Sequence, residues 1–153
     1  MSESHLTRRV CHYDGCMSEQ TLILVKPDGV QRGLTGEILR RIETKGYRIV
    51  QMRMLTATDE LLAQHYHEHT EKPFYAGMAA YMKSGPIVAA VIEGDRVIEG
   101  VRSLAGATEP TQAAPGTIRG DLGRDWGDGE IRNLIHSSDG TESAAHEISV
   151  WFD

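Results

Sequence analysis

The sequence predicts an α+β fold, an α/β sandwich built on a ferredoxin-like, four-stranded antiparallel sheet with helices packed on one face. Short apolar runs rich in β-branched residues alternate with helical stretches in the order strand, helix, strand, helices, strand, helix, strand, helix, which is the order of a split βαβ arrangement. Turn residues separate these runs. The 153 residues contain no internal repeat and no linker long enough to divide two domains, so a single core is expected.

The segment between Thr21 and Gly46 predicts a buried strand followed by a helix. Residues 21–25 (TLILV) are continuously apolar, which is typical of a strand covered on both faces. The turn-forming residues 26–29 (KPDG) end this strand. Thr35 is expected to cap a helix that carries a stripe of isoleucine and leucine, and Gly46 is placed to stop it.

A second strand is expected over residues 47–56. Met52 and Met54 continue an alternation of apolar side chains along one face, and the polar residues between them break any helical stripe. Thr58 is expected to open a second helical region, and another helix is expected after Pro73.

The remaining elements follow the same pattern. Residues 87–92 (IVAAVI) form the third expected strand, and Asp95 is expected to cap a helix that ends at Gly106. After a loop rich in proline and glycine, residues 134–136 (LIH) supply a short fourth strand. Asp139, with a glutamate three positions later, resembles a capping pair for the last helix.

Composition restricts the classes of function. The net charge of -6 argues against nucleic acid as the main partner, since that role needs a basic face, although a few arginines in one pocket would still bind a small anion. No apolar run approaches a membrane-spanning length, and residues 1–9 lack the apolar stretch of a signal peptide. Two cysteines make no disulfide framework, so a cytoplasmic location is expected.

Residues 1–18 are expected to be a flexible N-terminal extension, and residues 19–153 the folded domain. The extension shows no periodic pattern. Cys11, His12 and Cys16 offer metal-ligating side chains, but the sequence lacks the second pair of ligands that a structural zinc site needs. A loosely packed tail is therefore preferred over a metal site.

The most informative motif is residues 133–139 (NLIHSSD). His136 ends an apolar run and precedes a capped helix, so its ring would be held at a fixed place. Neutral imidazole is a good nucleophile near pH 7. Its attack on a phosphoryl group would give a phosphohistidine that can pass the group onward. Taken alone, a histidine packed at a sheet edge is the simpler interpretation.

Cationic side chains elsewhere favour phosphate chemistry. Lys26 follows the first strand, Arg102 lies near a helix end, and Arg119 is expected in a glycine-flanked turn. The arginine guanidinium matches phosphate oxygens, and glycine lets the backbone come close. Phosphoryl transfer needs little beyond positioned cations, a metal and an in-line nucleophile.

Six stretches of the sequence resemble, in order, the signature blocks of nucleoside diphosphate kinases. The resemblance covers residues 21–152, and six blocks in register are far more specific than one. The blocks are LVKPDGVQRGL, HYHEHTEKPFYAG, SGPIVAAVIEG, GATEP, APGTIRGD and NLIHSSDGTESAAHEI. The resemblance implies transfer of the terminal phosphoryl group from a nucleoside triphosphate to a nucleoside diphosphate by a ping-pong mechanism.

The resemblance also implies roles for individual residues. His136 would be the nucleophile, phosphorylated on Nδ1, with Glu147 polarising the imidazole and Ser138 steadying this pair. Lys26 and Asn133 would hold the sugar hydroxyls, and the lysine would also reach the transferred phosphate. Tyr66 would lie beside the histidine and the lysine, and Phe74 would stack on the base. The phosphate contacts would be His69, Arg102, Thr108 and Arg119.

Plainer interpretations remain for several of these residues. Tyr66 and Phe74 would also suit the core, and Glu147 would suit a solvated helix face. The histidines of residues 65–69 (HYHEH) suggest zinc, but only the first and last share a helix face, so no protein metal ligand is expected.

By the same resemblance, the expected cofactor is Mg²⁺, which would bridge phosphate oxygens. The expected partners are nucleoside di- and triphosphates with little base discrimination, because stacking reads a face common to all bases. A homo-oligomer, either a tetramer or a hexamer built from dimers, is also implied.

The chain departs from the family pattern in three places. Ser137 stands where glycine is usual, and residues 121–132 are a few residues longer than typical. That segment is expected to bulge outward, and its effect on Arg119 is left open. The chain also stops at Asp153, without the C-terminal tail of longer members.

The rival to a phosphotransferase function is a catalytically idle nucleotide-binding or scaffold protein. An RNA-binding module is disfavoured because RNP-type motifs are missing from the sequence.

Overall fold

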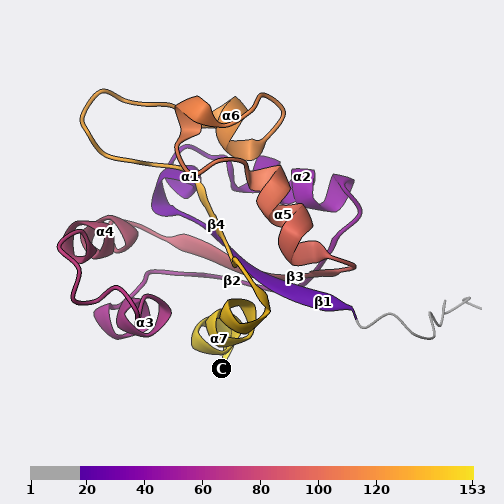
Figure 1. Cartoon of the computed structure of the whole chain (residues 1–153), viewed down its shortest axis with the longest axis horizontal. Coiled ribbons are helices and arrows are strands. Elements are labelled where there is room, and N and C mark those ends of the chain that lie inside the picture. The colour runs from indigo at the N-terminus through magenta and orange to yellow at the C-terminus, as the bar shows by residue number, and fades with distance from the viewer. Residues whose placement is uncertain (1–17) are drawn as a thin grey trace, which may run out of the picture.

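The computed structural model describes residues 18–153, which form one four-stranded sheet with helices around it (Figure 1). The sheet order is β2-β3-β1-β4, and every neighbouring pair is antiparallel, as the sequence predicted. The strands are β1 (Glu19–Val25), β2 (Arg48–Leu55), β3 (Ile87–Gly94) and β4 (Ile135–Ser137). The helices are α1 (Pro27–Gln31), α2 (Thr35–Thr44), α3 (Asp59–His65), α4 (Tyr75–Met82), α5 (Val97–Ala105), α6 (Ile118–Leu122) and α7 (Thr141–Phe152), with a 3-10 helix, η1, at Pro110–Gln112.

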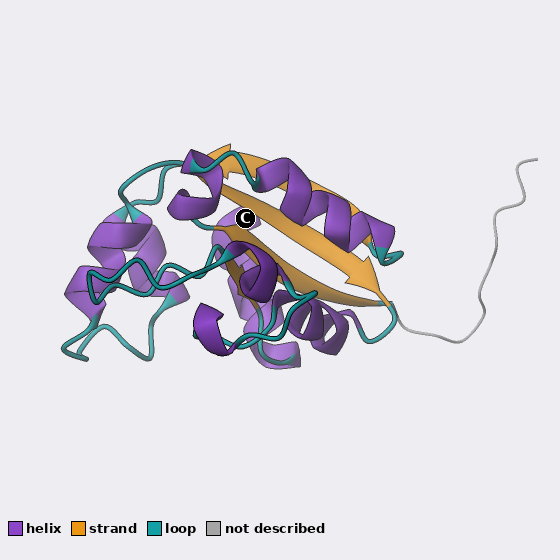
Figure 2. Cartoon of the chain, turned by 90° about the horizontal axis from the view of Figure 1, so that it is seen from above, coloured by secondary structure: helices purple, strands orange, loops and turns teal. Residues whose placement is uncertain are grey.

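Helices cover both faces of the sheet, so the expectation of one covered face was wrong (Figures 1 and 2). Ile23 and Val25 of β1 pack into a core with α2, α5 and α6. Leu22 and Leu24, which alternate with them, pack into a second core with α3, α4 and Trp151 of α7. The unbroken apolar run of β1 is the sequence feature that corresponds to this double coverage.

The edge strand β2 is far more exposed than the central strands. Met52 and Met54 expose 57% and 62% of their surface, and a register shift between Ile49 and Gln51 interrupts the ladder with β3. Alternation along residues 47–56 predicted the strand correctly. It did not predict that the face of β2 that carries Met52 and Met54 would be exposed to solvent.

Several local details differ from the expected turns and caps. Within the expected turn of residues 26–29, Lys26 is the N-cap and Pro27 begins α1, because a first helical turn needs no N–H from proline. Thr35 is the first residue of α2, and its side chain makes no cap bond. Arg96, with φ +52°, precedes α5 in place of Asp95. At α7, the Ser143 hydroxyl accepts from the Gly140 amide at 3.0 Å, the reciprocal bond expected of the glutamate.

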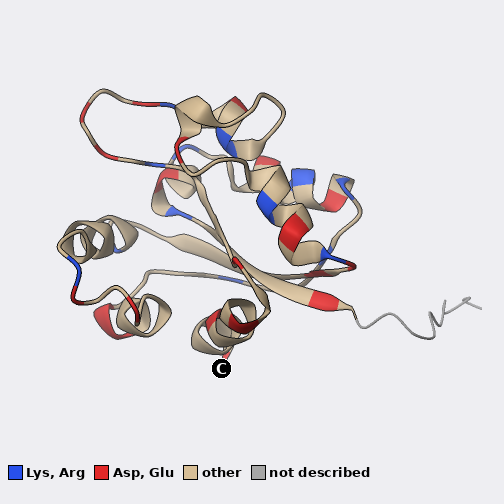
Figure 3. Cartoon of the chain, viewed as in Figure 1, with Lys and Arg blue, Asp and Glu red and all other residues tan. Residues whose placement is uncertain are grey.

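The structure bears on membrane spans, on the N-terminal extension and on the distribution of charge. None of the helices among residues 18–153 is long and apolar enough to cross a membrane. The N-terminal extension, with Cys11, His12 and Cys16, lies outside the described residues apart from Ser18. Acidic and basic side chains are interspersed along the described chain (Figure 3).

Candidate active site

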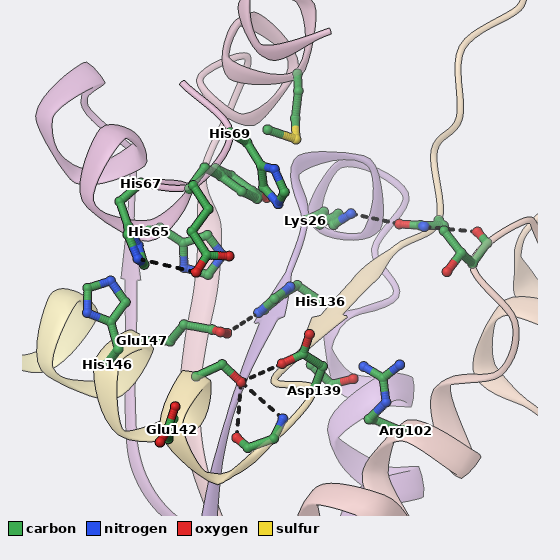
Figure 4. Close-up of a pocket in the computed structure, with 18 of the residues that line it drawn as sticks. Lys26, His65, His67, His69, Arg102, His136, Asp139, Glu142, His146 and Glu147 are labelled. Carbon is green, nitrogen blue, oxygen red and sulfur yellow. Dashed lines mark hydrogen bonds and ion pairs between the residues drawn. The ribbon is translucent and has the colours of Figure 1, made fainter. Parts of the chain in front are cut away.

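A cleft of about 1080 Å³ opens above the ends of β1 and β4, between α3, α5 and the start of α7 (Figure 4). The segments that line it are far apart in the sequence, and the sheet brings them together. Nine of the eleven predicted site residues line this cleft: Lys26, Tyr66, His69, Arg102, Thr108, Arg119, Asn133, His136 and Glu147.

His136 is oriented by a carboxylate on α7. Its Nε2 lies 2.5 Å from Oε1 of Glu147, and the buried Ser138 hydroxyl donates to the same oxygen at 3.1 Å. Ser138 in turn accepts from the amide of Leu22 on β1 at 3.2 Å. Because an ionised carboxylate only accepts, Nε2 carries the ring hydrogen and Nδ1 keeps a lone pair. The arrangement leaves the lone pair of Nδ1 free on a partly exposed ring that lines the cleft.

A second histidine lies directly behind His136. His65 packs edge-on against it, with ring centroids 4.7 Å apart, and its Nδ1 accepts from the Trp151 indole at 2.9 Å. Burial, with a smaller contribution from His136, lowers the pKa of His65 to about 2, so the ring stays neutral. The sequence analysis considered His65 only as a zinc ligand and did not predict its contacts with His136 and Trp151, because residues so far apart in the chain leave no spacing signal.

A metal bound by histidine is not supported by this geometry. Ligating atoms of His65, His136 and Glu147 lie within 4.8 Å of one another, but hydrogen bonds already join His136 to Glu147 and occupy Nδ1 of His65. The other two histidines of the 65–69 string have separate partners. His67 packs on His146, and His69 packs on Phe74.

Lys26 and Asn133 are joined across the cleft floor. The Lys26 ammonium donates to Oδ1 of Asn133 at 2.8 Å, and the Asn133 amide donates to the Thr108 carbonyl at 2.9 Å. Burial, assisted by the charge of Arg119, lowers the pKa of Lys26 to about 8, with Asp28 opposing the shift. These bonds tie the end of β1, the loop after α5 and the residues before β4 into one unit.

Arg119 lies on helix α6, where a glycine-flanked turn was expected. Its Nε, Nη1 and Nη2 donate to the carbonyls of Asn133, Gly106 and Ile135 at 3.1, 2.8 and 2.6 Å. Each Nη carries a second hydrogen, so the guanidinium retains donors for an anion in the cleft. Burial, followed by the charge of Arg102, lowers its pKa to about 10, so it remains cationic at neutral pH.

The long segment after α6 bulges outward, as expected, and leaves Arg119 in the cleft lining (Figure 1). Arg32 binds the Leu122 carbonyl at 2.7 Å and holds the start of this loop. The guanidinium groups of Arg32 and Arg124 lie 5.3 and 4.6 Å from the centroid of the Trp126 ring. The loop is therefore held by Arg32, which lies just after α1, and by contacts within the loop itself.

Two predicted residues are not part of the cleft lining. Ser138 lies beneath it and acts on Glu147. Phe74 is 53% exposed beside His69, with ring centroids 5.7 Å apart, so it is not a core aromatic. Tyr66 does line the cleft and also packs against the core under α3. Burial raises the pKa of its phenol, which therefore stays protonated.

The first turn of α7 also lines the cleft, which the sequence did not single out as part of the site. Thr141, Glu142 and Ser143 come from this turn, and Asp139 and Gly140 immediately precede it. The sequence analysis placed Asp139 at the start of the last helix, and only Ser137 and Ser138 separate it from His136, so this position already indicated that the turn lies beside the histidine.

Comparisons with known proteins agree with this geometry. The nucleoside diphosphate kinase family model matches residues 19–153. The chain is 54% identical over 134 residues to the nucleoside diphosphate kinase of Archaeoglobus fulgidus, covering 88% of this chain and 86% of that protein. It is 53% identical over 135 residues to the enzyme of Saccharomyces cerevisiae, with the same coverage.

Solved structures show the same fold. A halophilic nucleoside diphosphate kinase from Halobacterium salinarum in complex with CDP superposes with a TM-score of 0.83 at 46% identity, covering 90% of this chain and 89% of that one. A transition-state mimic of the Borrelia burgdorferi enzyme with vanadate and ADP superposes with a TM-score of 0.82 at 37% identity, covering 89% and 88%. The chain belongs to the nucleoside diphosphate kinase family and is a phosphotransferase that acts on nucleotides.

Proposed function

We propose that His136 carries the phosphoryl group between a nucleoside triphosphate and a nucleoside diphosphate. The single observation that supports this most directly is the bond between Nε2 of His136 and Glu147, which leaves Nδ1 as the nucleophile in a cleft that also holds Lys26, Arg102 and Arg119. A neutral imidazole with a fixed tautomer needs no deprotonation before it attacks.

The two half-reactions are mirror images. Nδ1 attacks the γ-phosphorus, the bond from phosphorus to the β-γ bridging oxygen breaks, and the diphosphate leaves with that electron pair. The imidazole gains positive character on Nε2–H, which the Glu147 carboxylate stabilises. In the second half, a terminal oxygen of an incoming diphosphate attacks the phosphohistidine, and the electron pair returns to Nδ1.

The nucleotide is proposed to bind with its phosphates inward and its base at the rim. Arg102, Arg119, Thr108 and His69 would hold phosphate oxygens, and Lys26 with Asn133 would hold the sugar hydroxyls, as the family resemblance implies. Phe74, half exposed beside the cleft residue His69, would stack on the base. Tyr66 would pack beside the reacting groups. Related enzymes were solved with CDP and with ADP, and this supports nucleotides of more than one base as substrates.

Mg²⁺ is proposed to enter with the nucleotide. The carboxylates of Asp139 and Glu142 line the same cleft, which suits an ion bound mainly by phosphate oxygens and reached by protein through water. When bound, the ion would neutralise charge on the phosphates.

The protein is also proposed to be a cytoplasmic homo-oligomer, either a tetramer or a hexamer built from dimers. Light scattering tests this assembly.

The test is transfer of label through the enzyme. After incubation with γ-labelled ATP and Mg²⁺, we expect an acid-labile, base-stable label that GDP or CDP removes. His136→Ala should abolish the label, whereas the control His67→Ala, at an exposed histidine, should retain it. Label that persists in His136→Ala would exclude His136 as the carrier. Binding of ATP without transfer to any diphosphate would favour the idle nucleotide-binding protein.

A further inference from the structure

A strained turn lies immediately before the proposed nucleophile. Leu134 has φ +71°, a left-handed conformation that side chains other than glycine rarely adopt. The amide of Ile135 donates to the Asn133 carbonyl at 2.7 Å, which closes a three-residue turn around Leu134. A γ-turn with positive φ is rare and strained. It fixes how Asn133 and His136, on either side of it, are spaced and oriented.

The polar groups of this turn are bound from outside it. The Lys26 amide donates to the Leu134 carbonyl at 2.8 Å, and Arg119 holds the carbonyls of Asn133 and Ile135. One contact remains, in which the Leu134 amide donates to Oδ2 of Asp28 at 3.2 Å. Strained backbone persists only where its surroundings determine it fully. Asp28 supplies the acceptor for the amide of the strained residue itself.

Asp28 is well placed to hold this amide. It is 6% exposed on α1, two residues after Lys26, and its other oxygen accepts from the Tyr81 hydroxyl on α4. Burial and this hydrogen bond raise the pKa of Tyr81, so the phenol remains a donor. The carboxylate thus joins three elements, α1, α4 and the turn before β4. Nothing in the proposed phosphoryl transfer otherwise uses Asp28 or Tyr81.

We propose that Asp28, oriented by Tyr81, is a positioning residue that holds the Leu134 turn and thereby aligns His136 with the bound phosphate. The inference rests on the proposed role of His136. A turn that relaxed would move the nucleophile while leaving Arg102 on α5 and Phe74 at the start of α4 in place. Nucleotide binding would then persist while the chemical step slowed, because in-line attack depends on sub-ångström alignment.

The experiment separates binding from chemistry. Single-turnover labelling of His136 at saturating ATP gives the rate of the chemical step, and titration with ADP gives affinity. For Asp28→Ala we expect the labelling rate to fall at least about tenfold, with ADP affinity within about threefold of wild type. Asp28→Asn should recover most of the rate, because its amide oxygen still accepts from Leu134 and its NH₂ still meets Tyr81.

A destabilised control distinguishes positioning from a loss of stability. Ile42→Ala empties a buried site on α2, where no atom of the Asp28 network lies, and it should slow labelling far less than Asp28→Ala. Equal slowing in both variants, or wild-type labelling by folded Asp28→Ala, would overturn the inference. If Asp28→Ala does not fold, Tyr81→Phe carries the test, and an unchanged labelling rate in that variant would overturn it.

Failure of the underlying function looks different. If wild-type enzyme carries no label on His136, the proposed carrier is wrong. If wild-type enzyme is labelled normally and the Asp28 and Tyr81 variants match it, only the positioning role is wrong.

Discussion

The indole N–H of Trp151 donates a 2.9 Å hydrogen bond to Nδ1 of His65, and the His65 ring lies edge-on to His136. This bond fixes His65 as the tautomer with its hydrogen on Nε2. Burial keeps the ring uncharged, since it lowers the pKa to about 2. His136 therefore packs against an oriented and uncharged neighbour, which places no positive charge beside its ring.

Trp151→Phe is expected to destabilise the fold. The substitution leaves the buried Nδ1 of His65 without its donor, which costs about 1–3 kcal/mol, and it also removes packed volume. Urea unfolding at a fixed protein concentration measures the loss. The matched control is Trp126→Phe in the exposed loop, which should change stability by less than about 1 kcal/mol. Equal effects of the two substitutions would show that the Trp151 bond contributes little.

Glu147→Gln is expected to slow phosphoryl transfer while sparing nucleotide binding. A neutral amide still reaches His136 but stabilises the developing imidazolium charge less well, so kcat should fall by about 10- to 100-fold. Steady-state kinetics with ATP and a diphosphate acceptor measures kcat and KM. Glu60→Gln, at an exposed position of α3, should leave both unchanged. A rise in KM with constant kcat would mean that Glu147 serves binding instead.

The pKa of Lys26 predicts how nucleotide affinity depends on pH. Burial lowers this pKa to about 8, so the ammonium loses its proton, and with it its charge-assisted hydrogen bond to the nucleotide sugar, as the pH rises through that value. ADP affinity should therefore weaken between about pH 7.5 and 9.5, where the phosphates are already fully ionised. Calorimetric titration across this range measures the decline. In Lys26→Arg, ADP affinity should change little over the same pH range, because a guanidinium stays charged. An equally steep decline in that variant would assign the titration to another group.

Phe74→Ala is expected to weaken all nucleotides by a similar factor. A ring that is 53% exposed beside His69 offers a stacking face without base-specific hydrogen bonds, and loss of stacking costs about 1–3 kcal/mol per base. Dissociation constants for ADP, GDP and CDP should rise together, by about 5- to 150-fold. Met54→Ala, at an exposed site on β2, is the control for a lost surface side chain. A selective loss for one base would contradict simple stacking.

Much of the fold was predictable because the signals were local. The apolar run of 21–25, the alternation of 47–56 and the run 87–92 each marked a strand that the structure contains. Coverage of the sheet on both faces was not anticipated, because it depends on which way each helix returns over the sheet. The strand β1 was itself the clue, since a run without polar residues is buried on both sides.

The candidate site was predictable where a motif carried it and hidden where packing did. The six family blocks contain eight of the nine predicted residues that line the cleft, and Arg102 lies between two blocks. The network of Asp28, Tyr81 and Leu134 was hidden because its members are 53 and 106 positions apart along the chain. A positive φ at a leucine leaves no mark in the sequence. The hydrogen bond of Trp151 to His65 was also hidden, because the two residues are 86 positions apart and the tryptophan looks like an ordinary core residue near the end of a helix.

Shortening the loop after α6 should leave activity nearly intact. Within the loop, the amides of Gly127 and Glu130 bind the side chains of Asp125 and Asp128, so its hydrogen bonds are local. Arg119 is held from outside the loop, by the carbonyls of Gly106, Asn133 and Ile135.

Deletion of residues 126–129 changes the loop-closure entropy only slightly, so kcat/KM should stay within about threefold of wild type. Arg119→Ala provides the contrast, because it removes both a phosphate donor and the brace on β4, and it should lower kcat/KM by more than about 100-fold. Steady-state assays of the two variants decide the matter. A tenfold or greater loss on deletion, about 1.4 kcal/mol, would mean that the loop itself positions Arg119.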